Sequence, residues 1–486
     1  MVIVDSTEIP QLHVVFLPFM GHGHMIPMVD MTKLFATSGV KTTIVTTPLN
    51  VPFVWTTIER SKNSGIDIDI KVLKWPCVEA GLPEGCENLE SIPTSHGVKW
   101  DMIRNFFTVI DLFQQPFEQL MQQCKPDCIV VDLFFVWATD TAHKFGIPRL
   151  MFNGSGFLSL CISDSINLYQ PHKRVESDSE PFVIPNLPGD IKLTKDQMPD
   201  MLKQSEENFF TEIVKRWRES ELKSYGFIVN SFYELEATYV DHYRNVVGMK
   251  AWHIGPVSLC NKMIEDKADR GKKSSIDRHK CLNWLDSKQP HSVVYICFGS
   301  VVDFSAAQLK EIALAIETTG QNFIWVVREE NKEEDWLPEG FEKIMEGKGL
   351  IIRGWAPQVL ILEHEATGAF VTHCGWNSTL EGVSAGLPMV TWPMFAEQFY
   401  NEKLVTEVLK IGIGVGVRKC VEVVGDFVKR DAIEKAVKEI MVGEKAEEMR
   451  SRAKALGETA KGAVENGGSS FRDLNALIRE LSSKRH

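Results

Sequence analysis

The chain alternates short apolar runs with longer amphipathic segments. In its first half the apolar runs predict strands near residues 12–17, 41–46, 129–131, 147–152 and 226–230. The segment after the first run has helix length and places Ile26, Val29 and Leu34 on one apolar face. Strands that are apolar throughout and alternate with helices are typical of a mainly parallel sheet covered on both faces. The first half therefore predicts a doubly wound α/β domain.

The same pattern restarts after a charged stretch. Residues 261–280 are poor in apolar positions, and further strands are predicted near 293–298, 322–327, 349–353, 368–372 and 389–392. We predict a Rossmann-like N-terminal domain over 1–255, a mobile linker over 256–280 and a Rossmann-like C-terminal domain over 281–468.

The end of the chain predicts one more helix. The break Asn466-Gly-Gly468 precedes it, and Ser470 with Asp473 forms the pattern of an N-terminal cap. We expect this helix to span 469–486 and to bury Phe471, Leu474, Ile478 and Leu481.

One stretch of the second half combines a strand, a loop and a helix into a candidate ligand site. From Trp355 to Gln398 it reads WAPQVLILEHEATGAFVTHCGWNSTLEGVSAGLPMVTWPMFAEQ. A loop from His373 to Ser378 leads into the helix, which ends in glycine, as helices often do. The free N–H groups and the positive dipole end of a helix N-terminus favour phosphate. Asn377 and Ser378 either add donors for it or only cap the helix.

Two more residues of this stretch suit the other parts of a nucleotide. Glu381 lies one turn after Asn377 on the same helix face, where its carboxylate can accept hydrogen bonds from a ribose diol. Trp355 follows a strand, at the edge of an open sheet where ligands bind, and its indole can stack on a base. Base, ribose and diphosphate in this order predict a nucleotide-sugar site.

The whole stretch, without a gap, resembles the plant secondary-product glycosyltransferase signature, which is the donor box of plant UDP-dependent glycosyltransferases. The resemblance implies a GT-B fold, in which two doubly wound Rossmann-like domains face each other across a cleft and the last helix crosses back onto the N-terminal domain. It implies an inverting O-glucosyltransferase that uses UDP-glucose and glycosylates a small apolar plant metabolite, of flavonoid or of terpenoid or steroid sapogenin type.

The resemblance also implies a role for each residue of the box. Trp355 would stack on uracil, with Ala356 and Gln358 at the base edge, and Glu381 would hold the ribose. The diphosphate would be surrounded by His373, Gly375, Trp376, Asn377 and Ser378, with a further donor from Ser300. Glu397 and Gln398 would bind the sugar, and glutamine at the last position favours glucose, while galactose or glucuronic acid stays the alternative.

The N-terminal half supplies a candidate base. His24 lies in the loop after the first strand and Asp132 ends a later strand, so both are expected at one sheet edge. An acceptor hydroxyl needs a base, and histidine is the usual one near neutral pH. An aspartate on the far ring nitrogen would fix the tautomer and stabilise the imidazolium. By resemblance to the family motif His24 is the base, and His22 is the alternative.

The composition limits the classes of molecule that the protein is expected to bind. The 486 residues are 44% hydrophobic and carry a formal net charge of −12, with a pI near 5.6. Such an acidic protein is poorly suited to nucleic acids or anionic membranes. The ten cysteines lack metal-ligand spacing, and the sequence shows no signal-peptide pattern and no long apolar stretch. We expect a cytoplasmic monomer that is not an integral membrane protein, and weak membrane association stays open.

Other chemistries fit less well. A nicotinamide dehydrogenase needs a third glycine where this chain has Ile26. Asp67 and Asp69 imitate the Asp-x-Asp of metal-dependent glycosyltransferases, but they alternate with isoleucines as on a half-buried strand. The family resembled is metal-independent, so we expect no metal and no cofactor, with UDP-glucose as co-substrate. A nucleotide-sugar binder without activity would keep the box and would not need His24 and Asp132.

Acceptor binding has weaker signals. Aromatic residues of the first half are candidates only, because core packing explains each of them better: Trp75, Trp100, Phe106 and Phe107. Ser155 either touches the sugar or is a turn residue.

Overall fold

The computed structural model describes residues 11–92, 99–203, 208–329, 336–421 and 426–484. The chain divides into two compact units. The first consists of Met1–Phe152, Trp217–Ile228 and Asp473–His486, and the second of Asn153–Arg216 and Val229–Arg472. The fold is of the predicted α/β class, with two parallel sheets and helices packed around them.

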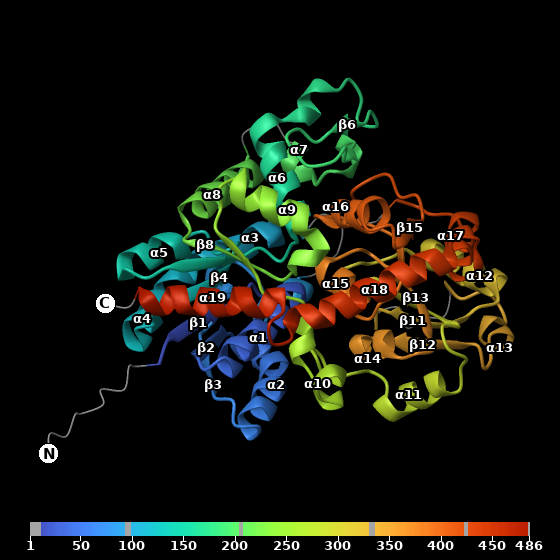
Figure 1. The fold of residues 1–486 in the computed structure, drawn as a ribbon, viewed down its shortest axis with the longest axis horizontal. Helices are drawn as coiled ribbons and strands as arrows, with labels where there is room; N and C mark the ends of the chain where they lie inside the picture. The colour runs from blue at the N-terminus through green and yellow to red at the C-terminus, as the bar shows by residue number, and fades with distance from the viewer. Residues whose placement is uncertain (1–10, 93–98, 204–207, 330–335, 422–425, 485–486) are drawn as a thin grey trace, which may run out of the picture. The chain divides into compact units, whose positions relative to one another are not determined.

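The first sheet runs in the order β3-β2-β1-β4-β5-β8-β9 (Figure 1). The pairs from β3 to β8 are all parallel. The chain order reverses at β1, which pairs with β2 on one side and with β4 on the other. Open sheets of this kind bind ligands at such a reversal, beyond the carboxyl ends of the strands. The strands are β1 His13–Leu17, β2 Lys41–Thr46, β3 Ile68–Val72, β4 Cys128–Asp132, β5 Arg149–Phe152, β8 Gly226–Val229 and β9 Ala251–His253.

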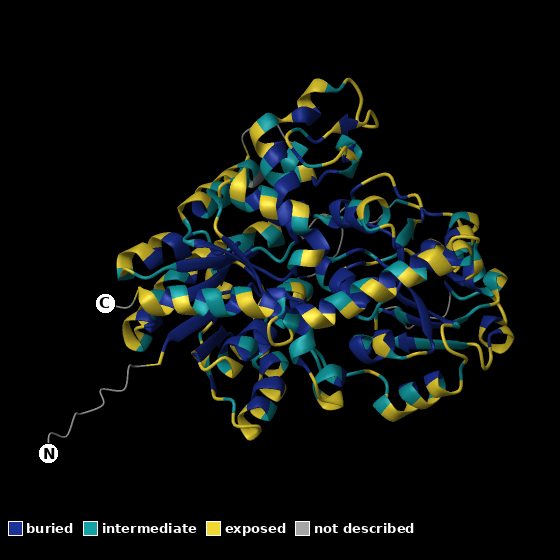
Figure 2. Ribbon diagram, viewed as in Figure 1, coloured by how far each residue is buried: buried dark blue, intermediate teal, exposed yellow. Residues whose placement is uncertain are grey.

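Helices and short 3-10 turns connect these strands. They are α1 His22–Thr37, η1 Pro48–Asn50, α2 Val51–Asn63, η2 Val78–Ala80, η3 Leu89–Ser91, α3 Lys99–Leu112, α4 Gln114–Cys124, α5 Ala138–Phe145 and α8 Phe209–Lys223. Figure 2 shows the strands buried and the helices with one buried and one exposed side, as layered α/β packing requires.

Helix α1 corrects the sequence prediction. It begins at His22, so both His22 and His24 lie in its first turn and not in the preceding loop. Val29 is buried as expected, but Ile26 and Leu34 are partly exposed, and methionines such as Met25 fill the core. Because β2 and α2 both pack against α1, its buried surface is wider than a single apolar stripe predicts.

The second unit contains a six-stranded sheet of order β12-β11-β10-β13-β14-β15, in which every pair is parallel. Its order reverses at β10, which lies between β11 and β13. The strands are β10 Val293–Cys297, β11 Asn322–Val327, β12 Gly349–Arg353, β13 Thr367–Thr372, β14 Met389–Thr391 and β15 Gly412–Gly414.

The remaining helices of this unit surround that sheet or belong to the segments before it. They are α6 Phe157–Tyr169, α7 Asp200–Lys203, α9 Tyr233–Asn245, α10 Ile264–Ala268, α11 Arg278–Asp286, α12 Ala306–Thr319, α13 Phe341–Ile344, α14 Gln358–Glu363, α15 Trp376–Ser384, α16 Gln398–Lys403, α17 Arg430–Val442 and α18 Ala446–Val464. A small antiparallel hairpin pairs β6 Phe182–Val183 with β7 Lys192–Leu193. Among the described residues, no helix combines the length and the apolar character that crossing a membrane requires.

Two segments have more structure than their composition indicates. The stretch 256–280, whose role as a linker stays a prediction, holds α10 and the start of α11 and contacts the donor box. The last helix, α19 Ser469–Ser483, begins at Ser469. Ser470 lies inside it and donates its hydroxyl to the carbonyl of Gly255 at 2.6 Å, so it is not the cap we expected.

The buried face of α19 is also shifted from the predicted one. Leu474, Leu477 and Leu481 are buried, whereas Phe471 is 38% exposed and Ile478 is partly exposed. Positions 474, 477 and 481 follow the helical spacing of three and four residues. The prediction is confirmed for Leu474 and Leu481, is wrong for Phe471 and Ile478, and missed Leu477.

Candidate active site

In the first unit, His24 and Asp132 meet at the point where the sheet order reverses. His24 lies in the first turn of α1, directly after β1, and Asp132 is the last residue of β4. The imidazole Nδ1 lies 2.6 Å from Asp132 Oδ2. The aspartate side chain is fully buried and that of His24 is 24% exposed. The contact makes Nδ1 the donor nitrogen and leaves Nε2 as the basic nitrogen of a neutral ring.

A buried arginine, Arg149, which the sequence analysis did not single out, holds the backbone of Asp132 in place. Arg149 donates to the carbonyl of Asp132 at 2.9 Å and to the hydroxyls of Thr139 and Ser220, each at 2.6 Å. Burial lowers the pKa of Arg149 to about 9, against the opposing effect of the Asp132 charge. The guanidinium is therefore still charged near neutral pH, and its hydrogen bond to the Asp132 carbonyl fixes the end of β4, where Asp132 lies.

Aromatic rings surround the His24 imidazole. The ring centroids of Phe19 and Phe134 lie 5.5 and 5.4 Å from it. Phe107, one of the predicted acceptor-binding residues, contacts Phe134 at 5.9 Å. Trp75 and Phe106 are each 1% exposed and pack on one another, which is the core role that we gave as their alternative. The side chain of Trp100 lies outside the described residues.

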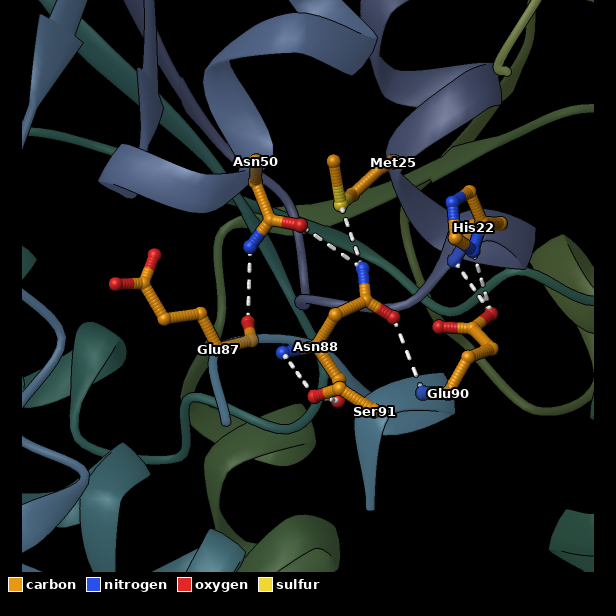
Figure 3. A network of polar contacts seen from close by, with 7 residues as sticks. All are labelled: His22, Met25, Asn50, Glu87, Asn88, Glu90 and Ser91. Carbon is orange, nitrogen blue, oxygen red and sulfur yellow. Dashed lines mark hydrogen bonds and ion pairs between the residues drawn. The ribbon is translucent and has the colours of Figure 1, made fainter. Parts of the chain in front are cut away.

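His22 has a different environment from His24. It is 2% exposed, its Nδ1 lies 2.9 Å from Glu90 Oε1, and its backbone N–H donates to the same oxygen at 3.0 Å (Figure 3). Burial alone would raise the pKa of Glu90, but the contacts with His22 outweigh it and lower the pKa. Asn88 continues the network, with its side chain accepting from the N–H of Glu90 at 3.1 Å and donating to Asn50 at 2.9 Å. His22 is thus enclosed by the protein.

In the second unit, the loop between β13 and α15 holds His373 among glycines. A Cβ at Gly299 would lie 2.8 Å from the imidazole, and one at Gly375 would collide with it, so both glycines are needed for the ring's position. Nδ1 of His373 has no hydrogen-bond partner among the described residues. Burial lowers the pKa of His373 to about 4, so the ring is neutral at pH 7. Ser300 follows Gly299, and Asn377 lies in the first turn of α15, as the sequence predicts.

The side chain of Trp376 is held by contacts with Asn230 and Gly156. Its indole N–H donates to the carbonyl of Asn230 at 2.7 Å, and the ring packs where a Cβ of Gly156 would otherwise lie. With 3% exposure the side chain is a packing element. Only its backbone N–H, in the first turn of α15, is suited to a diphosphate.

Glu381 lies at the centre of a polar network. Its Oε2 accepts from the Gln358 side chain at 2.7 Å, and its Oε1 pairs with Arg270. The same Gln358 amide group lies 3.3 Å from Ser378 Oγ, and its carbonyl accepts from the Tyr295 hydroxyl at 3.2 Å. Gln358 therefore orients the carboxylate that is expected to hold the ribose. Its place beside the base, with Ala356 and the partly exposed Trp355, stays a prediction.

At the end of the donor box, the side chain of Gln398 is held by backbone N–H groups of the box itself. Gln398 is 3% exposed, and its side-chain carbonyl accepts from the N–H groups of Met394 and Phe395 at 2.8 and 3.2 Å. The amide NH₂ is consequently the group that Gln398 can offer to a sugar. Glu397 accepts from Asn401 at 3.3 Å. The Ser155 hydroxyl donates to Asn153 at 2.9 Å, as a turn residue would.

No group of three or more histidine, cysteine, aspartate or glutamate side chains suited to a metal ion occurs in the described part of the chain. Asp67 has a 90% exposed side chain and Asp69 is partly exposed on β3.

Comparison with known proteins agrees with this geometry. A family model described as UDP-glucoronosyl and UDP-glucosyl transferase matches residues 118–451. The scopoletin glucosyltransferase of Nicotiana tabacum is 58% identical over 97% of this chain and 98% of its own length. The UDP-glucose flavonoid 3-O-glucosyltransferase 7 of Fragaria ananassa is 56% identical over 99% of this chain and 98% of its own.

A solved structure shows the same fold. UGT73P12 of Glycyrrhiza uralensis, complexed with glycyrrhetinic acid 3-O-monoglucuronide, matches with a TM-score of 0.89 and 42% identity, covering 97% of this chain and 96% of that chain. Matches of this length and identity place both sheets and the whole donor box within one family. The chain belongs to the UDP-glucoronosyl and UDP-glucosyl transferase family, and it is a plant-type UDP-dependent glycosyltransferase of the GT-B fold.

Proposed function

We propose that this enzyme transfers glucose from UDP-glucose to a phenolic hydroxyl of a small plant metabolite of coumarin or flavonoid type, with inversion at the anomeric carbon. The observation that carries the proposal is the 2.6 Å contact of His24 with Asp132 in a chain that also has the complete donor box. A protein that only binds nucleotide sugars has no use for such a pair. Relatives named for scopoletin and for flavonoids support the acceptor class.

His24 acts as the general base. Asp132 accepts the Nδ1–H, so Nε2 takes the proton of the acceptor hydroxyl as its oxygen forms a bond to the anomeric carbon. The bond from that carbon to the β-phosphate oxygen breaks, UDP leaves with the electron pair, and a single displacement inverts the configuration. A phenol has a pKa of about 10, as in tyrosine, and therefore gives up its proton to an imidazole far more easily than an aliphatic alcohol does.

The donor box binds UDP-glucose without a metal ion or a cofactor. Ser300, Asn377, Ser378, His373 and the N–H groups at the start of α15 hold the diphosphate, and the helix dipole offsets its charge. Trp355 stacks on uracil, Glu381 accepts from the ribose, and Glu397 with the Gln398 amide reads the sugar hydroxyls. Gln398→Glu replaces the NH₂ donor by an acceptor and keeps the shape, so kcat/KM for UDP-glucose should fall about ten- to a hundredfold.

The cellular setting follows from simpler features. Eight of the ten cysteines are buried, as thiols of a protein in a reducing compartment commonly are. We place the enzyme in the cytoplasm as a monomer.

The proposal is tested with the purified enzyme in two assays. In the first, UDP-glucose is offered with scopoletin, flavonols and triterpenoid sapogenins, and the products are detected by mass. We expect monoglucosides of the phenols to form fastest, and exclusive use of triterpenoids would overturn the acceptor class. In the second, UDP-glucose, UDP-galactose, UDP-xylose and UDP-glucuronate compete at equal concentration. If another sugar is used more than about tenfold faster, which corresponds to roughly 1.4 kcal/mol, the glucose assignment is wrong.

A further inference from the structure

A short segment outside the donor box contacts two residues of the box. Residues 270–275, named here the strap, lie between α10 and α11 in the second unit, which also contains the box. Composition predicts only a charged linker for this stretch. The contacts at its two ends are specific.

At one end, Arg270 is bound to Glu381. Its Nη1 pairs with Glu381 Oε1, and the two side chains are only 10% and 6% exposed. Gln358 already donates to the other carboxylate oxygen at 2.7 Å. Both oxygens of Glu381 therefore have a partner within the protein.

At the other end, Ser275 is anchored to Trp355. The N–H of Ser275 donates to the carbonyl of Trp355, and the N–H of Trp355 donates to Ser275 Oγ, both at 2.8 Å. Gly354 has a φ of +116°, and a Cβ there would collide with Ser275 Oγ, so the close approach depends on glycine. Lys272 lies between the two ends, with its Nζ 5.8 Å from the centroid of the Trp355 ring.

The contacts at the two ends of the strap differ in whether a bound nucleotide could take their place. The anchor at Ser275 uses backbone groups of Trp355, which a stacked base does not need. Arg270, in contrast, uses the carboxylate to which a ribose diol would donate, and a guanidinium and a diol are alternative donors to the same oxygens. Gly271, directly after Arg270, has a φ of +91°, and because glycine adopts positive and negative φ about equally well, the chain can turn at this residue.

We propose that Arg270 is a placeholder for the ribose of the donor. In the nucleotide-free enzyme the guanidinium holds Glu381, and binding of the UDP-sugar displaces it by a turn of the strap at Gly271 while the anchor of Ser275 to Trp355 stays. The inference rests on the proposed role of Glu381 in binding the ribose. On this proposal, the strap keeps the Glu381 carboxylate paired until the donor binds. An unpaired carboxylate with 6% exposure would cost free energy, because a buried charge loses its hydration.

Displacement has a measurable consequence. The affinity for the nucleotide is reduced by the fraction of molecules in which Arg270 occupies Glu381, and removing the guanidinium removes this reduction. Arg270→Ala and Arg270→Met should therefore bind uridine about threefold to tenfold more tightly than the wild type. The methionine variant keeps the apolar stem, which separates lost packing from lost competition.

Isothermal titration of the full chain with uridine, and separately with UDP, tests this prediction. Arg278→Ala is the matched control, because Arg278 follows the strap, pairs with the half-exposed Glu265 and not with the donor box, and should leave both affinities unchanged. Uridine carries no phosphate, so attraction of a cation to the diphosphate cannot affect that titration. Tighter uridine binding by both Arg270 variants supports the placeholder, and unchanged or weaker binding overturns it.

Failure of the proposed function gives a different result. A wild type that binds neither uridine nor UDP and transfers no sugar contradicts the donor site itself, and the placeholder with it. A wild type that binds UDP and transfers glucose, with uridine affinity unaffected by Arg270→Met, removes only the role of Arg270.

Discussion

The two histidines in the first turn of α1 are held by different carboxylates. His24 pairs with Asp132 and is partly exposed, whereas His22 is enclosed and pairs with Glu90. A base must reach the acceptor, so exposure favours His24. His24→Ala should lower kcat by at least about a hundredfold, the lower end of what a general base contributes, and leave the Kd for UDP within about twofold. Asp132→Ala should lose less, because a misoriented imidazole is still a base.

Steady-state kinetics with separate UDP titrations measure both quantities. His22→Gln is the control and should keep most of the turnover of the folded enzyme, with melting curves recorded for each variant. Near-full activity of His24→Ala combined with an inactive His22→Gln would transfer the role of base to His22.

The buried His373 predicts a pH dependence of stability. Burial lowers its pKa to about 4, against about 6.5 in an unfolded chain, so between these values the unfolded state binds more protons than the folded state. The free energy of unfolding should therefore decrease as the pH falls from 6.5 to 4, by at most about 3 kcal/mol from this residue.

Thermal midpoints at pH 7 and pH 4.5 test this contribution. His373→Gln cannot take up the proton and should lose less stability on acidification than the wild type. His279→Gln, which changes an exposed histidine of α11, should behave as the wild type. Equal losses of stability in the wild type and in His373→Gln would show that His373 takes up a proton as easily in the folded protein as in the unfolded chain.

For single residues, the sequence predicts which side chains lie near the candidate site, because the carboxyl ends of neighbouring parallel strands meet at one edge of the sheet. It placed His24 beside Asp132 for that reason. It does not predict the orientation of a side chain such as Trp376, nor a partner like Arg149, whose charge suggests the surface although it is fully buried. The pairing of Arg270 with Glu381 spans 111 positions and has no local pattern.

Helix α15 depends on the packing of its first residue against α6. Gly156 is the N-cap of α6, and a Cβ there would lie 2.5 Å from the ring of Trp376 and 2.9 Å from Glu236 Oε1. Gly156→Ala should therefore destabilise the protein by about 1–3 kcal/mol, as overpacking does. Displacing Trp376 also moves the first turn of α15, so the affinity for UDP should fall.

Chemical unfolding and UDP titration measure the two effects. Gly462→Ala in α18 is the control, because a Cβ there meets nothing within 4 Å and alanine favours a helix. A Gly156→Ala variant with unchanged stability and unchanged UDP affinity would show that the ring position of Trp376 is not needed by α15.

Most strands of the two large sheets were predictable, whereas β9, the β6–β7 hairpin and the buried helix faces were not. Apolar runs such as 322–327 coincide with β11, because a strand covered on both faces needs apolar residues at every position. In α1 and α19 the sequence offered several apolar rows, and the neighbouring elements decide which of them is buried. The stretch 256–280 has the composition of a linker, since its few specific contacts use charged and small residues such as Arg270 and Ser275.

The proposed site residues of both sheets lie at the same topological position. His24 and Asp132 follow β1 and β4, and Ser300 and His373 follow β10 and β13, the pairs at which each sheet order reverses. The sequence predicts this placement because it shows two doubly wound patterns. The proposed function assigns the second position to the donor and the first to the acceptor. Nothing in the pattern of strands distinguishes glucose from galactose, because that choice depends on single hydrogen bonds.

A last prediction concerns the whole enzyme and metal ions. The groups proposed to neutralise the diphosphate are N–H groups at the start of α15, the side chains of Asn377 and Ser378 and the helix dipole, which need no divalent ion. EDTA should therefore leave kcat and KM for UDP-glucose within about twofold of their values without it, and added Mg²⁺ or Mn²⁺ should change them equally little.

The assay compares enzyme dialysed against EDTA with enzyme resupplied with each ion, and a magnesium-dependent kinase treated in parallel verifies that the chelation is complete. Loss of activity in EDTA with recovery by one ion would contradict the proposed stabilisation of UDP and would direct attention to Asp67 and Asp69. Asp67→Ala and Asp69→Ala should leave the activity unchanged, because Asp69 lies on β3 and Asp67 directly before it, away from the reversal at β1 and β4 where the proposed base lies.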